Sequence, residues 1–92
     1  MAFAKREFLK CTIAAEQGVA AAQYNLGLMY ALGNGVLQDN VYAHMWFNIA
    51  ASQGDEIAAI FRDQVAGEMT PADISAAQNL ARECVKKNYK DC

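Results

Sequence analysis

The feature that most constrains this chain is an internal repeat with an offset of 36 residues. Residues 13–22 align with residues 49–58, and six of the ten aligned positions are identical, including a glycine that follows the same Ile-Ala-Ala-x-Gln run in both copies. A period in the mid-thirties is the span of a two-helix unit in α-solenoid proteins, in which each unit buries its apolar face against its neighbours.

Apolar residues at helical spacing predict five helices, over residues 3–17, 20–32, 40–53, 56–66 and 71 to about 87. Gly18 and Gly54 each follow the end of a predicted helix, where glycine adopts left-handed backbone angles without steric cost. Asp39 and Thr70 are suited to cap the helices that follow them, and Pro71 suits a first helical position. No segment alternates with the period of a strand. The expected fold is therefore all-α: an α-α superhelix, a right-handed solenoid of antiparallel helix pairs with about five helices.

The predicted helix 40–53 is apolar on nearly every side, which is typical of a helix surrounded by several neighbours. Its polar residues His44, Asn48 and Ser52 fall on one narrow line. We expect this line to face solvent. Ser52 is two turns from His44, too far for a direct hydrogen bond, so no pair of nucleophile and base is predicted there.

These motifs together resemble the Sel-one-like repeat of the tetratricopeptide superfamily. The residues that carry the resemblance are Gly18-x-x-x-Ala22-Gln23-Tyr24-x-Leu26-Gly27-x-x-Tyr30, Gly33-x-Gly35-Val36-x-x-Asp39 and Ala43-x-x-Trp46-Phe47-x-x-Ala50-Ala51-x-Gln53-Gly54. The resemblance implies one domain over residues 1–92 with a complete repeat at 18–54. Residues 3–17 resemble the second helix of a truncated repeat, and residues 55–88 a degenerate repeat that caps the C-terminal end. The resemblance also implies a bacterial source.

Composition and charge exclude several classes of function. The chain has 92 residues, eight basic and ten acidic residues, and a formal charge of −2. It therefore lacks the basic surface that nucleic-acid binding requires. Its apolar stretches are shorter than the ~18–20 residues that cross a bilayer, and no apolar signal sequence follows the first Met. We expect no cofactor, no metal site and no enzymatic activity, with a hydrolase as a remote alternative.

The three cysteines, Cys11, Cys84 and Cys92, form no metal-binding or disulfide pattern. The favoured interpretation is two buried thiols, Cys11 and Cys84, and a tail thiol, Cys92. A Cys84–Cys92 bridge is an alternative if the tail folds back. Unpaired cysteines fit the cytoplasm, and a periplasmic or secreted location is the alternative if an upstream signal was removed.

The resemblance implies a protein-interaction module, a scaffold or adaptor that holds a peptide or a partner helix on the concave face of the solenoid. The residues expected to contact this ligand are Tyr24, Leu28, Leu32, Ile57, Ile60 and Gln64. The alternative for these residues is packing on the fifth helix or scattered apolar surface. A second hypothesis is a stacking or oligomerisation unit, because Phe3 and Phe8 lie on a helix without an upstream neighbour and leave an open apolar end.

Overall fold

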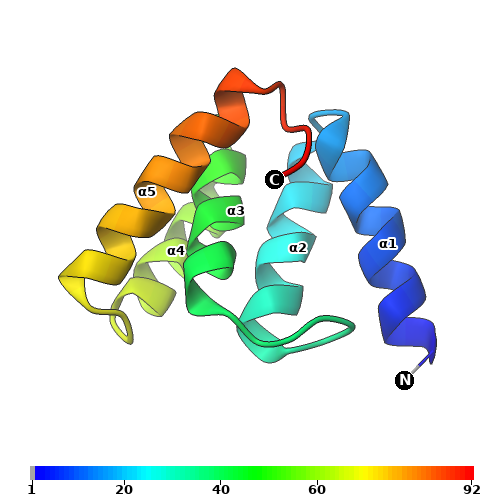
Figure 1. Ribbon diagram of the computed structural model, residues 1–92, viewed down its shortest axis with the longest axis horizontal. Helices are drawn as coiled ribbons and strands as arrows, with labels where there is room; N and C mark the ends of the chain where they lie inside the picture. The colour runs from blue at the N-terminus through cyan, green and yellow to red at the C-terminus, as the bar shows by residue number, and fades with distance from the viewer. Residues whose placement is uncertain (1) are drawn as a thin grey trace.

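The chain folds into five consecutive α-helices (Figure 1), in a computed structural model that describes the backbone of residues 2–92 and the side chains of residues 4–92. The helices are α1 (Ala2–Glu16), α2 (Ala20–Leu32), α3 (Asn40–Ser52), α4 (Glu56–Ala66) and α5 (Pro71–Lys86). The described residues contain no strand, and neighbouring helices pack as an α-α superhelix requires. The predicted fold class is confirmed, and the bounds of α2 and α4 are those predicted from the sequence.

The turns that follow α1 and α3 have the same geometry, as the 36-residue offset predicts. Gly18 has a φ of +87° and Gly54 a φ of +100°, both in the left-handed region that favours glycine. The N–H of Gly18 donates to the carbonyl of Ala15 at 3.0 Å, and the N–H of Gly54 donates to the carbonyl of Ala51 at 2.9 Å. The register of the internal repeat is therefore confirmed at both turns.

The predicted helix starts also form. The Asp39 carboxylate accepts hydrogen bonds from the N–H groups of Val41 and Tyr42, at 2.9 and 3.1 Å, and so satisfies two free donors of the first turn of α3. The Thr70 hydroxyl oxygen accepts from the N–H of Asp73 at 3.1 Å at the start of α5. Local side chains thus fix where these two helices begin.

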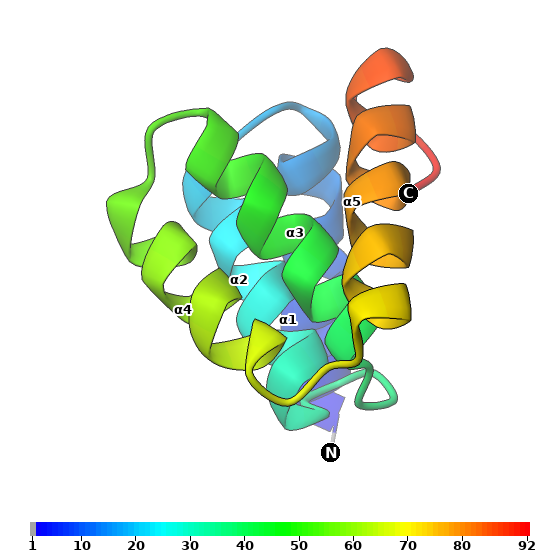
Figure 2. The ribbon, with the colours of Figure 1, turned by 90° about the vertical axis from the view of Figure 1, so that its left-hand side faces the viewer.

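Helix α3 lies at the centre of the fold. It packs against α2, α4 and α5, whereas α1 packs against α2. Figure 2 shows α4 on one side of α3 and α5 on the other, and α4 and α5 are not a closely packed pair among the described residues. One cluster of buried side chains joins α1, α2, α3 and α5 around Trp46, and a second joins α2, α3 and α4 around Phe47. The prediction that α3 is apolar on most sides because it is surrounded is confirmed.

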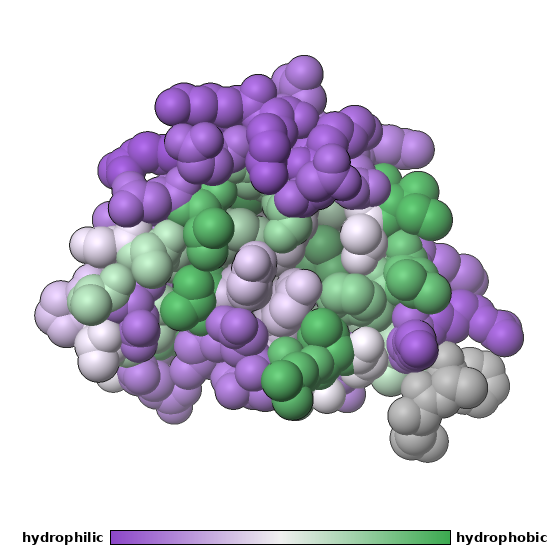
Figure 3. Space-filling view, in the orientation of Figure 1, coloured by the Kyte–Doolittle hydropathy of each residue, from purple (hydrophilic) through white to green (hydrophobic). Residues whose placement is uncertain are grey.

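Charged and apolar surfaces are separated on the face shown in Figure 3. Hydrophilic side chains gather along its upper edge, where the end of α5 and the C-terminal segment lie in Figure 1, and apolar surface lies below them. Leu9 and Ile13 of α1 are among the large apolar side chains that remain exposed to solvent.

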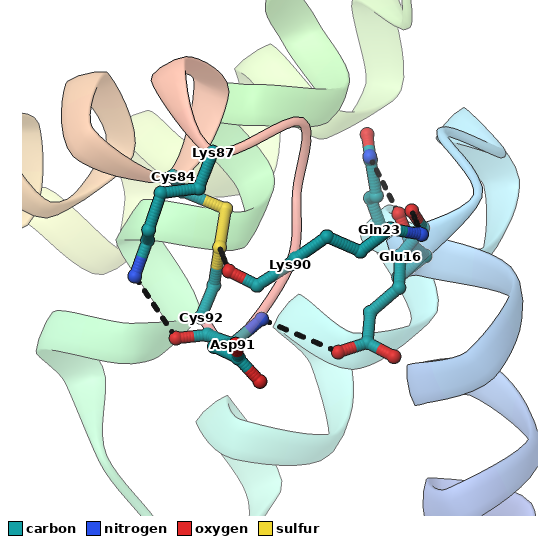
Figure 4. Close-up of a disulfide and its surroundings, with 8 residues drawn as sticks. Glu16, Gln23, Cys84, Lys87, Lys90, Asp91 and Cys92 are labelled. Carbon is teal, nitrogen blue, oxygen red and sulfur yellow. Dashed lines mark hydrogen bonds between the residues drawn. A yellow bond between two sulfur atoms is a disulfide. The ribbon is translucent and has the colours of Figure 1, made fainter.

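A disulfide joins Cys84 of α5 to Cys92, the last residue of the chain (Figure 4). The expectation of two separate thiols is therefore wrong, and the alternative pairing is the one that forms. Cys84 is buried as predicted, but as half of a disulfide. Only Cys11 remains a free cysteine.

The disulfide anchors a C-terminal segment, residues 87–92, that returns across the molecule to the turn between α1 and α2. The ammonium group of Lys90 donates to the carbonyl of Glu16 at 2.7 Å, and the N–H of Asp91 donates to the Glu16 carboxylate at 3.4 Å. The ring of Tyr89 lies against Gly18, where an added Cβ atom would be 3.3 Å from it. The C-terminal segment is thus held against the turn between α1 and α2, and the cytoplasmic expectation loses its basis, which was the unpaired state of the cysteines.

Candidate functional site

The six residues predicted to contact a ligand lie on α2 and α4, on the side of α3 away from α5 (Figure 2). Tyr24 joins the two helices. Its ring centroid lies 5.7 Å from that of Phe61 on α4, in an edge-to-face arrangement, and 5.9 Å from that of Phe47 on α3. The α2–α4 surface, defined by these six predicted residues, is therefore joined at Tyr24 by aromatic contacts with α3 and α4.

The six residues differ in how much they expose. Leu32 is 70% exposed, and Ile57 and Ile60 are 56% and 57% exposed. Gln64 is also exposed, whereas Tyr24 and Leu28 are half-buried and pack against the cluster around Phe47. None of them belongs to the cluster of buried side chains that contains residues of α5, so packing on the fifth helix does not account for this surface. Leu32, Ile57 and Ile60 therefore keep more than half of their surface in water.

A hollow of about 290 Å³ extends the α2–α4 surface toward α1. Leu28 and Leu32 line it from α2, and Glu7 and Cys11 line it from α1. Sequence reasoning did not include the two α1 residues, because their side of α1 is defined only by how α1 packs on α2. Burial, and secondarily the Glu7 carboxylate, raise the pKa of the Cys11 thiol, so this thiol stays protonated and weakly nucleophilic at neutral pH.

His44 contradicts the prediction of a solvent-exposed line on α3. Its side chain is buried, with the residue 3% exposed, and its Nδ1 has no hydrogen-bond partner among the described residues. The position on the helical wheel was correct, but α4 and α5 flank this line of α3 and cover it at His44. Asn48, one turn along, is only partly buried, and its amide oxygen accepts from the Arg62 guanidinium at 3.0 Å.

Burial lowers the pKa of His44, the nearby Arg62 adds to this effect, and Asp63 opposes it. The unfolded chain therefore binds the proton more readily than the folded chain does. We expect the free energy of unfolding to decrease as pH falls from about 7 to about 5.5, with a slope of up to ~1.4 kcal/mol per pH unit. Urea denaturation at a series of pH values measures this slope.

The matched variant for this experiment is His44→Gln, which removes the only histidine of the chain. The slope between about pH 7 and about 5.5 is expected to disappear in the variant, because aspartate and glutamate titrate mainly at lower pH. An equal slope in both proteins would show that His44 is not its source.

A buried glutamine was missed by sequence reasoning. The side chain of Gln23 on α2 is fully buried, and its Nε2 donates to the carbonyl of Ala15 at 3.2 Å. Its Oε1 accepts from Nε2 of Gln53 at 2.6 Å. Gln23 therefore connects the end of α1 to the end of α3. The signal in the sequence was a single polar residue beside Ala22 on the inward side of α2.

The polar groups near α4 have structural partners. The Asp55 carboxylate accepts from the N–H of Ala58 at 3.0 Å and caps α4, as its position at the helix start favours. The Ser52 hydroxyl donates to the carbonyl of Ile49 at 2.6 Å. Among the described residues, no three His, Cys, Asp or Glu side chains are grouped closely enough to hold a metal ion. No helix in the described part of the chain is both long and apolar enough to span a membrane.

The fold defines the class of protein: consecutive helix pairs packed as an α-α superhelix, with a side-by-side pair of helices that exposes aliphatic side chains. A family model for the Sel1 repeat matches residues 20–55, which span α2, the glycine-containing loop and α3. This match covers less than half of the chain and agrees with the resemblance seen in the sequence. No curated protein matches the chain. Sel1 repeats generally mediate interactions between proteins and are not themselves enzymes.

Proposed function

We propose that the chain is a non-enzymatic interaction module that binds an extended peptide or a partner helix on the α2–α4 surface. The observation that carries this proposal is the exposure of Leu32 on α2 and of Ile57 and Ile60 on α4, two helices that the Tyr24–Phe61 contact joins. Aliphatic side chains that stay in water gain free energy when a partner covers them. The adjoining hollow between α1 and α2 offers a place for one side chain of the ligand.

An array of synthetic peptides, followed by titration of the best binder, tests this proposal. The double variant Leu32→Asp/Ile60→Asp is expected to weaken binding by about tenfold or more, because each substitution puts a charge where apolar surface would be buried. Both positions are exposed, so the fold should persist. Tyr24 is left unchanged, because its ring contributes to the interior.

Leu37→Asp is the control, since Leu37 is an exposed apolar residue of the loop between α2 and α3. This variant is expected to bind like the parent. Equal binding by the parent and by Leu32→Asp/Ile60→Asp would remove the α2–α4 surface as the ligand site.

The second candidate function is a stacking or oligomerisation unit, and it is favoured by α1. Phe8 does not form an open end, because its ring packs edge-to-face on Tyr30 with centroids 5.6 Å apart. Phe3 lies outside the described side chains. Leu9 and Ile13, however, are exposed on α1. Size-exclusion chromatography with light scattering distinguishes the two functions: a protein that remains monomeric at high concentration would argue against self-stacking.

The hydrolase alternative gains no support from the arrangement of His44 and Ser52. The Ser52 hydroxyl is engaged by the Ile49 carbonyl, and the unpartnered Nδ1 of His44 is enclosed in the interior. A serine nucleophile needs an adjacent base within hydrogen-bonding reach.

A further inference from the structure

A second apolar hollow lies on a different side of the molecule from the α2–α4 surface. Helices α4 and α5 flank α3 without packing closely on each other within the described residues, and a cleft of about 390 Å³ opens between α3 and α5. Its apolar lining includes Ile49 of α3 with Ala81 and Val85 of α5. Val85 is 45% exposed. A volume of this size is in the range of protein sites that bury a ligand.

One wall of the cleft is positively charged. Arg82 and Lys86 line it and lie four residues apart, on the same side of α5. Lys86 pairs with Glu83 at 3.4 Å, but both side chains are more than half exposed, so this pair holds the ammonium group only weakly. The Arg82 guanidinium donates to the amide oxygen of Asn79 at 2.9 Å, a neutral partner that leaves its charge uncompensated. Arg82 and Lys86 form the rim of the cleft on the α5 side. Their positive charge favours a negatively charged ligand.

Two polar atoms on the α3 wall of the cleft are already engaged. The amide oxygen of Asn48 accepts from Arg62, and the Ser52 hydroxyl donates to the Ile49 carbonyl. A ligand would therefore gain little from new hydrogen bonds with the α3 wall. Recognition would come from apolar contact in the cleft and from charge at the α5 rim.

The neighbours of α3 show what kind of element fits beside it. Helix α4 packs on α3 with the buried residues Ala58 and Val65, seven residues apart, and α5 packs on it with a row that includes Ala77 and Ala81. Both neighbours are amphipathic helices that present buried residues one or two turns apart. The cleft is bounded by α3 and α5, and a groove between two helices is a place where a further helix can pack.

We propose that this cleft is a second interaction surface, and that it takes an acidic amphipathic helix of a partner protein. The helix would place an aliphatic side chain against the exposed Val85, above the buried Ile49 and Ala81, and carboxylates beside Arg82 and Lys86. The exposed apolar side of α1 in a second copy fits poorly, because Lys5, Arg6 and Lys10 give that helix an excess of the same charge as the rim. This inference does not depend on ligand binding at the α2–α4 surface.

The probe for this proposal is a synthetic alanine-rich peptide of about 15 residues, the length at which an isolated helix begins to be stable in water. It carries two leucines seven residues apart and a glutamate one turn from each leucine. A twin peptide carries lysine in place of each glutamate. Titration followed by two-dimensional NMR of the full chain is expected to show saturable shifts at Ala81, Val85 and the Asn48 side-chain amide with the glutamate peptide.

The variant Arg82→Glu/Lys86→Glu reverses the charge of the rim at two exposed positions. We expect it to weaken binding of the glutamate peptide by about tenfold or more and to bind the lysine peptide better than the parent does. The control is Lys10→Glu, which reverses a charge on α1, far along the chain from the cleft. It should leave the affinities for the glutamate peptide and for the lysine peptide unchanged.

Four results would overturn the proposal. The first is the absence of saturable shifts at about 1 mM peptide, the weakest affinity that a specific site of this kind would have. The second is equal binding of both peptides by the parent and the rim variant. The third is a set of shifts at the cleft that depends on protein concentration alone, which would make a second copy the occupant. Shifts confined to α2 and α4 would also reject the cleft and would support the α2–α4 surface instead.

Discussion

The Gly27→Val variant is expected to lose about 3 kcal/mol or more of unfolding free energy, because α2 and α3 approach each other too closely for a side chain. A Cβ atom added at Gly27 would lie 2.5 Å from Cδ1 and Cε1 of Phe47. The Phe47 ring is fully buried, and the rings of Tyr24 and Phe61 lie beside it, so it has little room to move. A domain of this size has only about 5 kcal/mol in total. Thermal and urea denaturation followed by circular dichroism should therefore show a protein near the limit of folding.

A double-mutant cycle identifies the cause of this loss. If the clash with the ring is responsible, Gly27→Val should add little destabilisation in a Phe47→Ala background, which itself costs about 3–5 kcal/mol. The Asn25→Val variant, at an exposed position of the same helix, controls for the lower helix propensity of valine and should change stability by less than about 0.7 kcal/mol. Full additivity of Gly27→Val and Phe47→Ala would mean that the close approach of α2 and α3 at Gly27 does not determine stability.

The second large effect is expected at the C-terminal segment. Replacing Cys92 with serine opens the eight-residue link to Cys84 and is expected to cost about 2–3 kcal/mol, from the conformational entropy that the cross-link removes from the unfolded chain. Residues Asn88, Tyr89 and Asp91 all have positive φ values, so the segment adopts backbone angles that an untethered chain seldom holds. Without the link, we expect it to leave the α1–α2 turn.

Hydrogen exchange measures this release directly. The amide of Val19, which donates to the carbonyl of Ala14 in the turn that Tyr89 covers, should exchange faster in Cys92→Ser. A dithiol reductant should have the same effect on the parent, because exchange with the disulfide yields two cysteine thiols and an oxidised reductant, but no effect on Cys92→Ser. The Cys11→Ser variant should respond like the parent. A parent protein whose stability is the same with and without reductant would contradict a stabilising role for the link.

Local rules were sufficient for most of the fold. The ends of α1 and α3 follow from Gly18 and Gly54, whose left-handed angles are required by the turn itself, and the starts of α3 and α5 follow from Asp39 and Thr70, whose side chains bond within the same turn. The burial of Trp46 followed from the apolar composition of α3. Each of these predictions depends on residues a few positions apart, which is the range over which sequence patterns are informative.

The errors concern contacts between distant parts of the chain. His44 was placed correctly on α3, but whether that line meets water depends on where α4 and α5 lie. The pairing of Cys92 with Cys84 depends on a segment whose path is set by Glu16 and Gly18, more than seventy residues earlier. At the α2–α4 surface, helical spacing correctly grouped the side chains on each helix. Tyr24 is half-buried because Phe61 of α4 lies beside it. The apolar periodicity of α2 carries no information about where α4 lies.

The hydrogen bonds of Gln23 have a consequence for the geometry of the superhelix. By bonding to Ala15 and to Gln53, this one side chain ties the end of one helical layer to the equivalent point of the next. Because these bonds require good distances and angles, they fix the rotation between the two layers. That rotation sets the pitch of the superhelix and hence the curvature of the surface that α2 and α4 form.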